Sequence, residues 1–126
     1  MSTPRVVRVL CVDDNQDLAD TTAYLLGMCG YEARACYNGP AALAAVDGGF
    51  IPDVCLIDLT MPGMDGDELA PRLRARLPGR NPLLVAMTAM ATEGAMRRTL
   101  DAGFDHHFVK PVDPDRLLAV MARLDG

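Results

Sequence analysis

The sequence predicts an α/β fold in which a five-stranded parallel sheet carries helices on both faces. Three observations lead to this prediction. Five short β-rich segments alternate with five segments that favour helix, an order typical of parallel sheets covered by helices. The 126 residues, 50% of them hydrophobic, match the size of one ordinary domain. No linker, repeat or low-complexity segment divides the chain.

The first half of the chain supplies three strands and two helices. Residues 6–14 form a β-rich run that ends in two acids, and residues 17–30 carry leucines at helical spacing. Residues 31–36 alternate small or aromatic side chains with charged ones, as a half-exposed edge strand does. A short helix begins near Asn38, a good N-cap, and residues 53–58 form a buried strand.

The second half continues the alternation with one irregular helix. This helix covers about residues 65–77 and contains Pro71, which lacks an amide donor and clashes with the preceding turn. We therefore expect the helix to start late or to bend at Pro71. A strand, a weak helix, a strand and a well-capped helix follow, over residues 82–89, 92–103, 104–110 and 113–124.

Composition excludes several classes of protein. The net charge is −5, from 17 acidic and 12 basic residues, which argues against a nucleic-acid-binding domain. No segment resembles a signal peptide, and no apolar run approaches the roughly 20 residues needed to cross a bilayer. The four cysteines form no C-x-x-C pair, and Cys11 and Cys55 lie in apolar strands, where reduced, buried thiols are expected. We expect a soluble, cytoplasmic protein that contacts neither nucleic acid nor membrane directly.

Polar residues collect where four of the five strands end. Ligands of open α/β sheets bind outside the carboxyl ends of the strands, so groups placed there should converge on one edge. The groups are three carboxylates, one hydroxyl and one ammonium, from Asp13, Asp14, Asp58, Thr88 and Lys110. Taken singly, they also fit ordinary roles as helix caps, a strand-end threonine and a surface lysine. Their conjunction favours a shared site.

The charges of this set predict phosphoryl chemistry. Crowded carboxylates repel one another unless a cation joins them, and oxygen ligands suit a hard divalent ion. Mg²⁺ fits best, because it takes one or two carboxylates and leaves places for water and phosphate oxygens. Lys110 and Thr88 can each contact a phosphoryl oxygen. Asp58 is the carboxylate able to attack phosphorus and form an aspartyl phosphate.

The motifs CVDDN, LIDLTMPGMDG, MTA and FVKP, in this order and spacing, resemble the receiver domain of two-component response regulators. The resemblance covers about residues 5–124, so residues 1–126 are expected to form a single receiver domain. It implies a flavodoxin-like (βα)5 sandwich with the strand order of that fold.

The resemblance also implies a metal and phosphorylation site. Asp58 matches the phospho-accepting aspartate and Asp14 the acid that binds Mg²⁺ directly. Asp13 matches its companion, which acts through water, and the backbone carbonyl of Thr60 matches the remaining protein ligand of the metal. Mg²⁺ is the only cofactor implied.

The resemblance assigns switch residues as well. Thr88 matches the switch hydroxyl and Lys110 the lysine that contacts the phosphoryl group, and the Lys110–Pro111 bond is expected to be cis. His107 occupies the position where the family usually carries Tyr or Phe. It is interpreted either as an ordinary strand histidine or as a switch residue that follows Thr88 and, because imidazole titrates near neutral pH, responds to pH. His106 should point to the opposite face of the sheet, so the two histidines are not expected to bind one metal.

The implied function is that of a signalling switch. Asp58 receives a phosphoryl group from the phosphohistidine of a histidine kinase or histidine phosphotransfer protein. The surface formed by the last two helices and the strand between them then changes to control a downstream protein. The protein is expected to catalyse only its own phosphorylation and dephosphorylation, as a monomer or a phosphorylation-dependent dimer. We expect no output domain, and we interpret Met1 and the lack of a linker as slightly favouring a stand-alone receiver over a piece of a hybrid kinase or longer regulator.

Two other functions fit the sequence less well. A Mg²⁺-dependent phosphatase with an aspartyl-phosphate intermediate would carry a second acid two residues after the nucleophile, where this chain has Thr60, and would need a cap domain. An FMN-binding flavodoxin would need a Ser/Thr/Gly-rich phosphate loop after the first strand, where this chain has the acidic segment DDNQD.

Overall fold

Five parallel strands form one sheet in the order β2-β1-β3-β4-β5 in the computed structural model, which describes residues 6–122. This is the flavodoxin-like architecture that the sequence predicts. The strands are β1 (Arg8–Val12), β2 (Glu32–Cys36), β3 (Val54–Asp58), β4 (Leu83–Thr88) and β5 (His106–Val109). β3 is buried along its whole length, whereas the edge strand β2 alternates between exposed and partly buried side chains, as expected.

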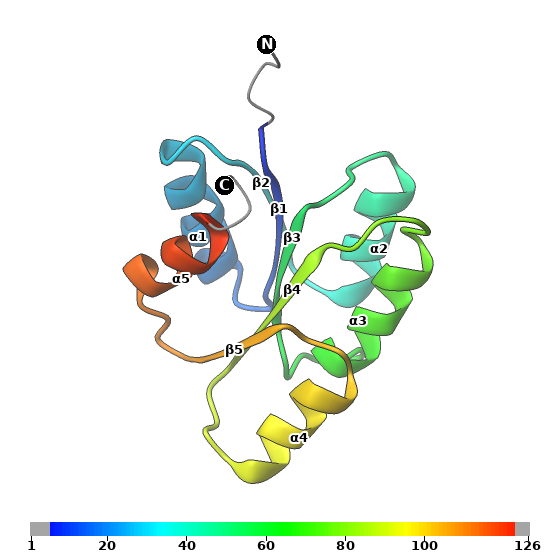
Figure 1. Cartoon of the computed structure of the whole chain (residues 1–126), viewed down its shortest axis with the longest axis vertical. Helices are drawn as coiled ribbons and strands as arrows, with labels where there is room; N and C mark the ends of the chain where they lie inside the picture. The colour runs from blue at the N-terminus through cyan, green and yellow to red at the C-terminus, as the bar shows by residue number, and fades with distance from the viewer. Residues whose placement is uncertain (1–5, 123–126) are drawn as a thin grey trace.

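Helices cover both faces of the sheet (Figure 1). They are α1 (Gln16–Met28), α2 (Gly39–Asp47), α3 (Gly66–Ala75), α4 (Glu93–Asp101) and α5 (Pro114–Ala122). α1 and α5 pack on one face, where Leu26, Leu117 and Met121 contact the buried side chains of the strands. α2, α3 and α4 pack on the other face, around a core that includes Leu43, Leu69 and Ala95. The two cores hold the sheet between them and leave its carboxyl edge open.

Local capping explains where several helices begin. The Asn38 side chain accepts a hydrogen bond from the Ala41 amide at 2.8 Å, which confirms its predicted role as the N-cap of α2. α5 begins at Pro114, and Asp113 immediately before it accepts from the Asp115 amide at 2.9 Å. These ends depend only on nearby residues, so the sequence predicts them well.

Of the two outcomes expected for the helix containing Pro71, a late start is wrong, and a bend at Pro71 stays a prediction. α3 begins at Gly66, directly after its N-cap Asp65, and Pro71 lies inside it. Proline in a helix interior costs roughly 3 kcal/mol. Leu69 and Leu73 are fully buried, and each contributes about 1.5–3 kcal/mol, so their packing outweighs the cost of the proline.

The thiols of the sheet are inert. Cys11 and Cys55 are buried and free, as predicted, and burial raises the pKa of each to about 12. Both therefore remain protonated at neutral pH. Within residues 6–122, no helix combines the length and apolar character needed to cross a bilayer.

Candidate functional site

The carboxyl ends of the strands bring the predicted polar residues to one edge of the sheet. Asp58 is the last residue of β3, and its register partner on β4 is Met87, next to Thr88. Asp13 follows β1, which pairs with β3 on the other side, and Lys110 follows β5. The Lys110 amide donates to the Thr88 carbonyl at 2.7 Å, which continues the ladder past the end of β5.

Three carboxylates form a cluster at this edge. Asp13, Asp14 and Asp58 each offer an oxygen, and these oxygens all lie within 4.8 Å of one another. Asp13 and Asp58 are only 2% and 6% exposed, whereas Asp14 is exposed. Two buried acids this close destabilise the fold unless positive charge compensates them.

Lys110 supplies part of that charge. Its Nζ donates to Asp13 Oδ2 at 2.8 Å and lies 3.3 Å from Asp58 Oδ2. Burial lowers the pKa of Lys110, but its hydrogen bond to Asp13 and the negative charge of Asp58 outweigh that effect, and the net pKa is raised. The ammonium therefore stays charged and bridges two of the three acids.

Lys110 compensates Asp58 only in part. The pKa of Asp58 is raised to about 6: burial raises it most, Lys110 lowers it, and the charge of Asp13 raises it again. The acidic cluster therefore keeps an excess of negative charge, which is expected of a site that accepts a cation. The shorter contact of Lys110 is with Asp13 rather than with Asp58.

The remaining predicted residues lie around this cluster. Thr88 is 1% exposed, and its Oγ1 accepts a hydrogen bond from the Met90 amide at 3.1 Å. The Thr60 amide donates to Asp58 Oδ1 at 3.3 Å, which holds the start of the β3–α3 loop against the acid. The Lys110–Pro111 bond is cis, as expected.

His107 has an unusual environment. Its register partner is Ala86, on the face covered by α2, α3 and α4, whereas His106 pairs with Val85, which packs on the opposite face. The Nε2 atom of His107 is buried and has no hydrogen-bond partner in the part of the chain that the structure describes. A buried polar atom without a partner is costly, and a rearrangement that satisfies it would be favoured.

Comparison with known proteins identifies the family. The family model described as the response regulator receiver domain matches residues 9–122. The chain belongs to this family. The receiver is 38% identical over 111 residues to the sensory transduction protein RegX3 of Mycobacterium tuberculosis, a match that covers 88% of this chain and 47% of RegX3. It is 37% identical over 125 residues to the sensor protein GacS of Pseudomonas syringae, covering 97% of this chain and 14% of GacS.

Solved structures agree with this assignment. A CheY-like response regulator receiver domain protein from Methanospirillum hungatei superposes on the receiver with a TM-score of 0.85 and 28% sequence identity. The match covers 96% of the receiver and 94% of that chain. By contrast, the receiver spans about half the length of RegX3 and a much smaller share of GacS. The predicted family and fold are thereby confirmed, and receivers of this family are signalling switches.

The acidic cluster of the receiver suits a divalent metal. Its donors are carboxylate oxygens, which Mg²⁺ prefers, and the exposure of Asp14 leaves that side open to water and phosphate. A doubly charged cation beside Asp13 and Asp58 also offsets the repulsion that Lys110 leaves uncompensated. The residues present therefore fit the metal that the family implies.

The structure adds residues that sequence reasoning missed. Gly66 packs so closely against β3 that a Cβ atom there would lie 2.5 Å from the Asp58 carbonyl oxygen. Arg98 of α4 contacts Asp65, Asp67 and the Leu59 carbonyl around the loop that follows Asp58. The Asp-Gly pair at the end of LIDLTMPGMDG could have indicated that the glycine is needed there, but nothing in the local sequence links Arg98 to this loop.

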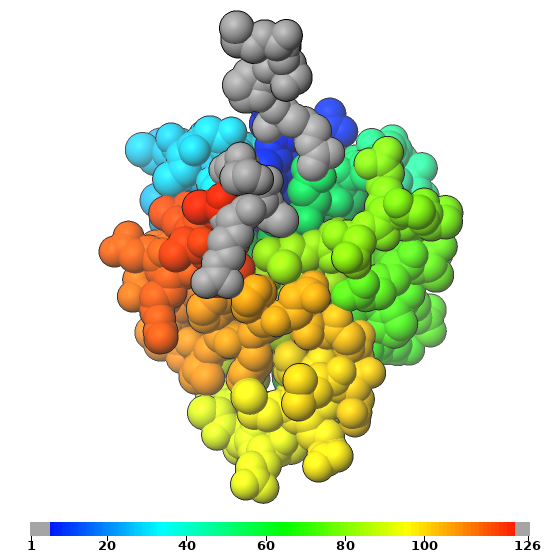
Figure 2. Space-filling model, viewed as in Figure 1, coloured from blue at the N-terminus to red at the C-terminus, as the bar shows by residue number. Residues whose placement is uncertain are grey.

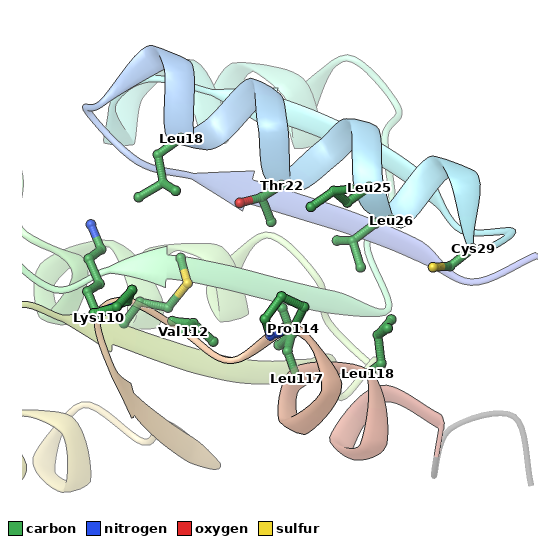
Figure 3. A pocket seen from close by; sticks show the side chains of 12 residues that line it. Leu18, Thr22, Leu25, Leu26, Cys29, Lys110, Val112, Pro114, Leu117 and Leu118 are labelled. Carbon is green, nitrogen blue, oxygen red and sulfur yellow. The ribbon is translucent and has the colours of Figure 1, made fainter.

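An apolar groove lies beside the site, between α1 and α5 (Figure 3). It has a volume of about 390 Å³ and runs from Lys110 along the receiver toward Cys29. α1 also exposes Tyr24 and Met28, whose side chains are 69% and 70% exposed. An open apolar groove that begins beside the acidic cluster is typical of a protein-binding face.

Proposed function

We propose that the chain is a phospho-accepting receiver in which Asp58 takes a phosphoryl group from a phosphohistidine. The observation that carries this proposal is the convergence of Asp58 with Asp13, Asp14 and Lys110 at the carboxyl edge of the sheet. Residues 5–124 act as one receiver domain, and its partners are a histidine kinase or histidine phosphotransfer protein and a downstream protein. The chain acts as a switch and catalyses only its own phosphorylation and dephosphorylation, in the cytoplasm.

The chemistry follows from the charges. A carboxylate oxygen of Asp58 attacks phosphorus, a P–O bond forms to Asp58, and the P–N bond to the donor histidine breaks so that its electron pair returns to the imidazole. Asp13, Asp14, Asp58 and the Thr60 carbonyl would hold Mg²⁺, which neutralises charge on the phosphoryl oxygens. Lys110 contacts one phosphoryl oxygen and Thr88 another. The apolar groove between α1 and α5, which begins at Lys110, supports docking of the donor protein beside this edge.

The output surface is formed by α4, β5 and α5. Figure 2 shows α4 in yellow, β5 in orange and α5 in orange to red, side by side on one face of the molecule. Met96, Leu100 and Val109 on this surface are 46%, 71% and 42% exposed, respectively. When Thr88 turns from the Met90 amide toward the phosphoryl group, β4, β5 and α4 rearrange, and this surface then binds a downstream protein or a second receiver.

His107 is the second switch residue of this proposal. The space that Thr88 vacates allows the imidazole to move inward, where its unpartnered Nε2 gains a hydrogen-bond partner. Because imidazole changes charge between about pH 5 and 8, this movement depends on pH.

We expect His107→Phe to remove the pH dependence of activation between pH 6 and 8. The measurement is the change in ¹H–¹⁵N amide shifts of α4 and β5 on phosphorylation, recorded at several pH values in that range. His106→Phe is the matched control, because His106 lies on the other face of the sheet, and it should leave the dependence intact. The same pH dependence in His107→Phe and the wild type would exclude the switch role of His107.

The phosphorylation test uses intact mass. Incubation of the wild-type chain with acetyl phosphate and Mg²⁺ is expected to add one phosphoryl group, because a small acyl phosphate can replace the phosphohistidine as donor. Chelation of Mg²⁺ should prevent the addition, since Lys110 alone does not neutralise the negative charge of the three acids. A chain that gains no mass under these conditions would contradict the proposal.

The phosphatase alternative gives a different outcome in the same experiment. A Mg²⁺-dependent phosphatase would release inorganic phosphate over many turnovers, whereas a switch accumulates the phosphorylated form. The residue two positions after Asp58 is Thr60, whose side chain is not a carboxylic acid and therefore cannot assist repeated hydrolysis as a general acid or base. We therefore expect phosphate release to be slow compared with phosphorylation.

A further inference from the structure

Arg98 of α4 ties three parts of the β3–α3 segment together. Its Nε and Nη2 donate to the two carboxylate oxygens of Asp67 at 3.0 and 2.9 Å. Nη2 also lies 3.4 Å from Asp65 Oδ2 and 3.4 Å from the Leu59 carbonyl oxygen. The pair with Asp67 lowers the pKa of that acid, so both partners stay charged at neutral pH. One guanidinium therefore spans both ends of the loop between β3 and α3.

That loop carries the carbonyl of Thr60, and a hydrogen bond from the next amide orients it. The Met61 amide donates to Asp65 Oδ1 at 2.9 Å. The Thr60 carbonyl and the Met61 amide belong to the same planar, trans peptide unit, so they point in opposite directions. Once Asp65 holds the amide on one side, the carbonyl must face the other side.

Asp65 itself is held by Arg98. Its Oδ1 accepts from Met61 while its Oδ2 faces the guanidinium, so the carboxylate is fixed at both oxygens. Asp65 is the N-cap residue of α3, yet its side chain accepts no bond from the first turn of the helix. N-cap aspartates ordinarily use the side chain to satisfy that turn, so this carboxylate serves the loop instead.

We propose that Arg98 is a positioning residue for the metal site: through Asp65, it orients the Thr60–Met61 peptide so that the Thr60 carbonyl is presented to Mg²⁺. The inference rests on the proposed function, in which Mg²⁺ binds beside Asp58. Hydrogen-bonding partners of ligating groups act in this way because they limit the orientations that the ligand can adopt.

The arrangement has a consequence for signalling. Arg98 belongs to α4, part of the proposed output surface, and Asp65 belongs to the loop that carries a metal ligand. Metal binding and the position of α4 are therefore coupled, and a change at either alters the other by the same free energy. This route is separate from the movement of Thr88 and His107.

The test is the dissociation constant of Mg²⁺, measured by calorimetry on the unphosphorylated full chain, together with the ¹H–¹⁵N shift of the Met61 amide. Arg98→Gln is expected to weaken Mg²⁺ binding about tenfold, because loss of a residue that helps to orient a metal ligand typically lowers metal affinity by at least that factor. The Met61 amide should shift even without metal. The matched control is Arg97→Gln on the neighbouring exposed position of α4, and it should change neither quantity.

A second variant separates positioning from folding. Asp65→Asn keeps an oxygen that can accept from Met61 and leaves the Arg98–Asp67 pair in place, so α4 stays anchored. It should weaken Mg²⁺ binding less than Arg98→Gln, and the double variant should lose about as much as Arg98→Gln alone, because both changes act through the same carboxylate. Unchanged Mg²⁺ binding in folded Arg98→Gln, or fully additive losses in the double variant, would overturn the role of Arg98. A wild-type chain that binds no Mg²⁺ would instead overturn the proposed function and this inference with it.

Discussion

Asp58→Asn is expected to abolish phosphorylation by acetyl phosphate and, without Mg²⁺, to stabilise the fold. The carboxamide cannot attack phosphorus, so no phosphoryl group should be added. Folding raises the pKa of Asp58 from 3.8 to about 6, so ionisation opposes folding as the pH rises through that interval. At pH 7 the full penalty is present, and its removal should increase the free energy of unfolding by about 2–3 kcal/mol.

The neighbouring lysine makes this gain possible. Replacing Asp58 leaves Lys110 with its 2.8 Å contact to Asp13, so no buried cation is left alone. Intact mass measures the phosphorylation, and chemical denaturation in a chelator at pH 3.5 and pH 7 measures the stability. The gain should be present at pH 7 and largely absent at pH 3.5. Asp101→Asn, on an exposed helix surface, is the control and should change neither property. A phosphorylated Asp58→Asn chain would show that another residue accepts the group.

Gly66→Ala is expected to destabilise the protein by about 1–3 kcal/mol or more and to slow phosphorylation. The added Cβ would lie 2.5 Å from the Asp58 carbonyl oxygen and within 3.0 Å of Ile57 and Leu59 atoms. Two of these atoms belong to the backbone of β3 and the residue after it, so they cannot move aside as a side-chain tip can. Relief of the clash must shift either α3 or Asp58.

Gly27→Ala provides the matched control. Gly27 lies inside α1, where a Cβ would meet no atom within 4 Å. Alanine there should stabilise the helix by roughly 0.5–1 kcal/mol, because glycine loses more backbone freedom on folding. Denaturation of the two variants gives the comparison. Equal stability of Gly66→Ala and the wild type would mean that α3 tolerates a small outward movement.

Much of the fold could be predicted because its signals are local. The alternation of segments indicated the parallel sheet, and the positions of Asp13, Asp58 and Lys110 at strand ends predicted that they meet at one edge of it. The cap at Asn38 depends on residues only three positions apart. That Pro71 does not delay the start of α3 could not be predicted in this way, because the burial of Leu69 and Leu73 outweighs the local preference of Pro71.

The family, the architecture and the set of groups at the carboxyl edge follow from the sequence, because strand periodicity and residue type are local properties of the chain. Three-dimensional packing decided how those groups share charge: Lys110 lies closer to Asp13 than to Asp58. It also decided that Arg98 reaches Asp65, 33 positions away, and that Gly66 must lack a side chain. Such contacts depend on the packing of α3 and α4 against the sheet, and no local pattern encodes those distances.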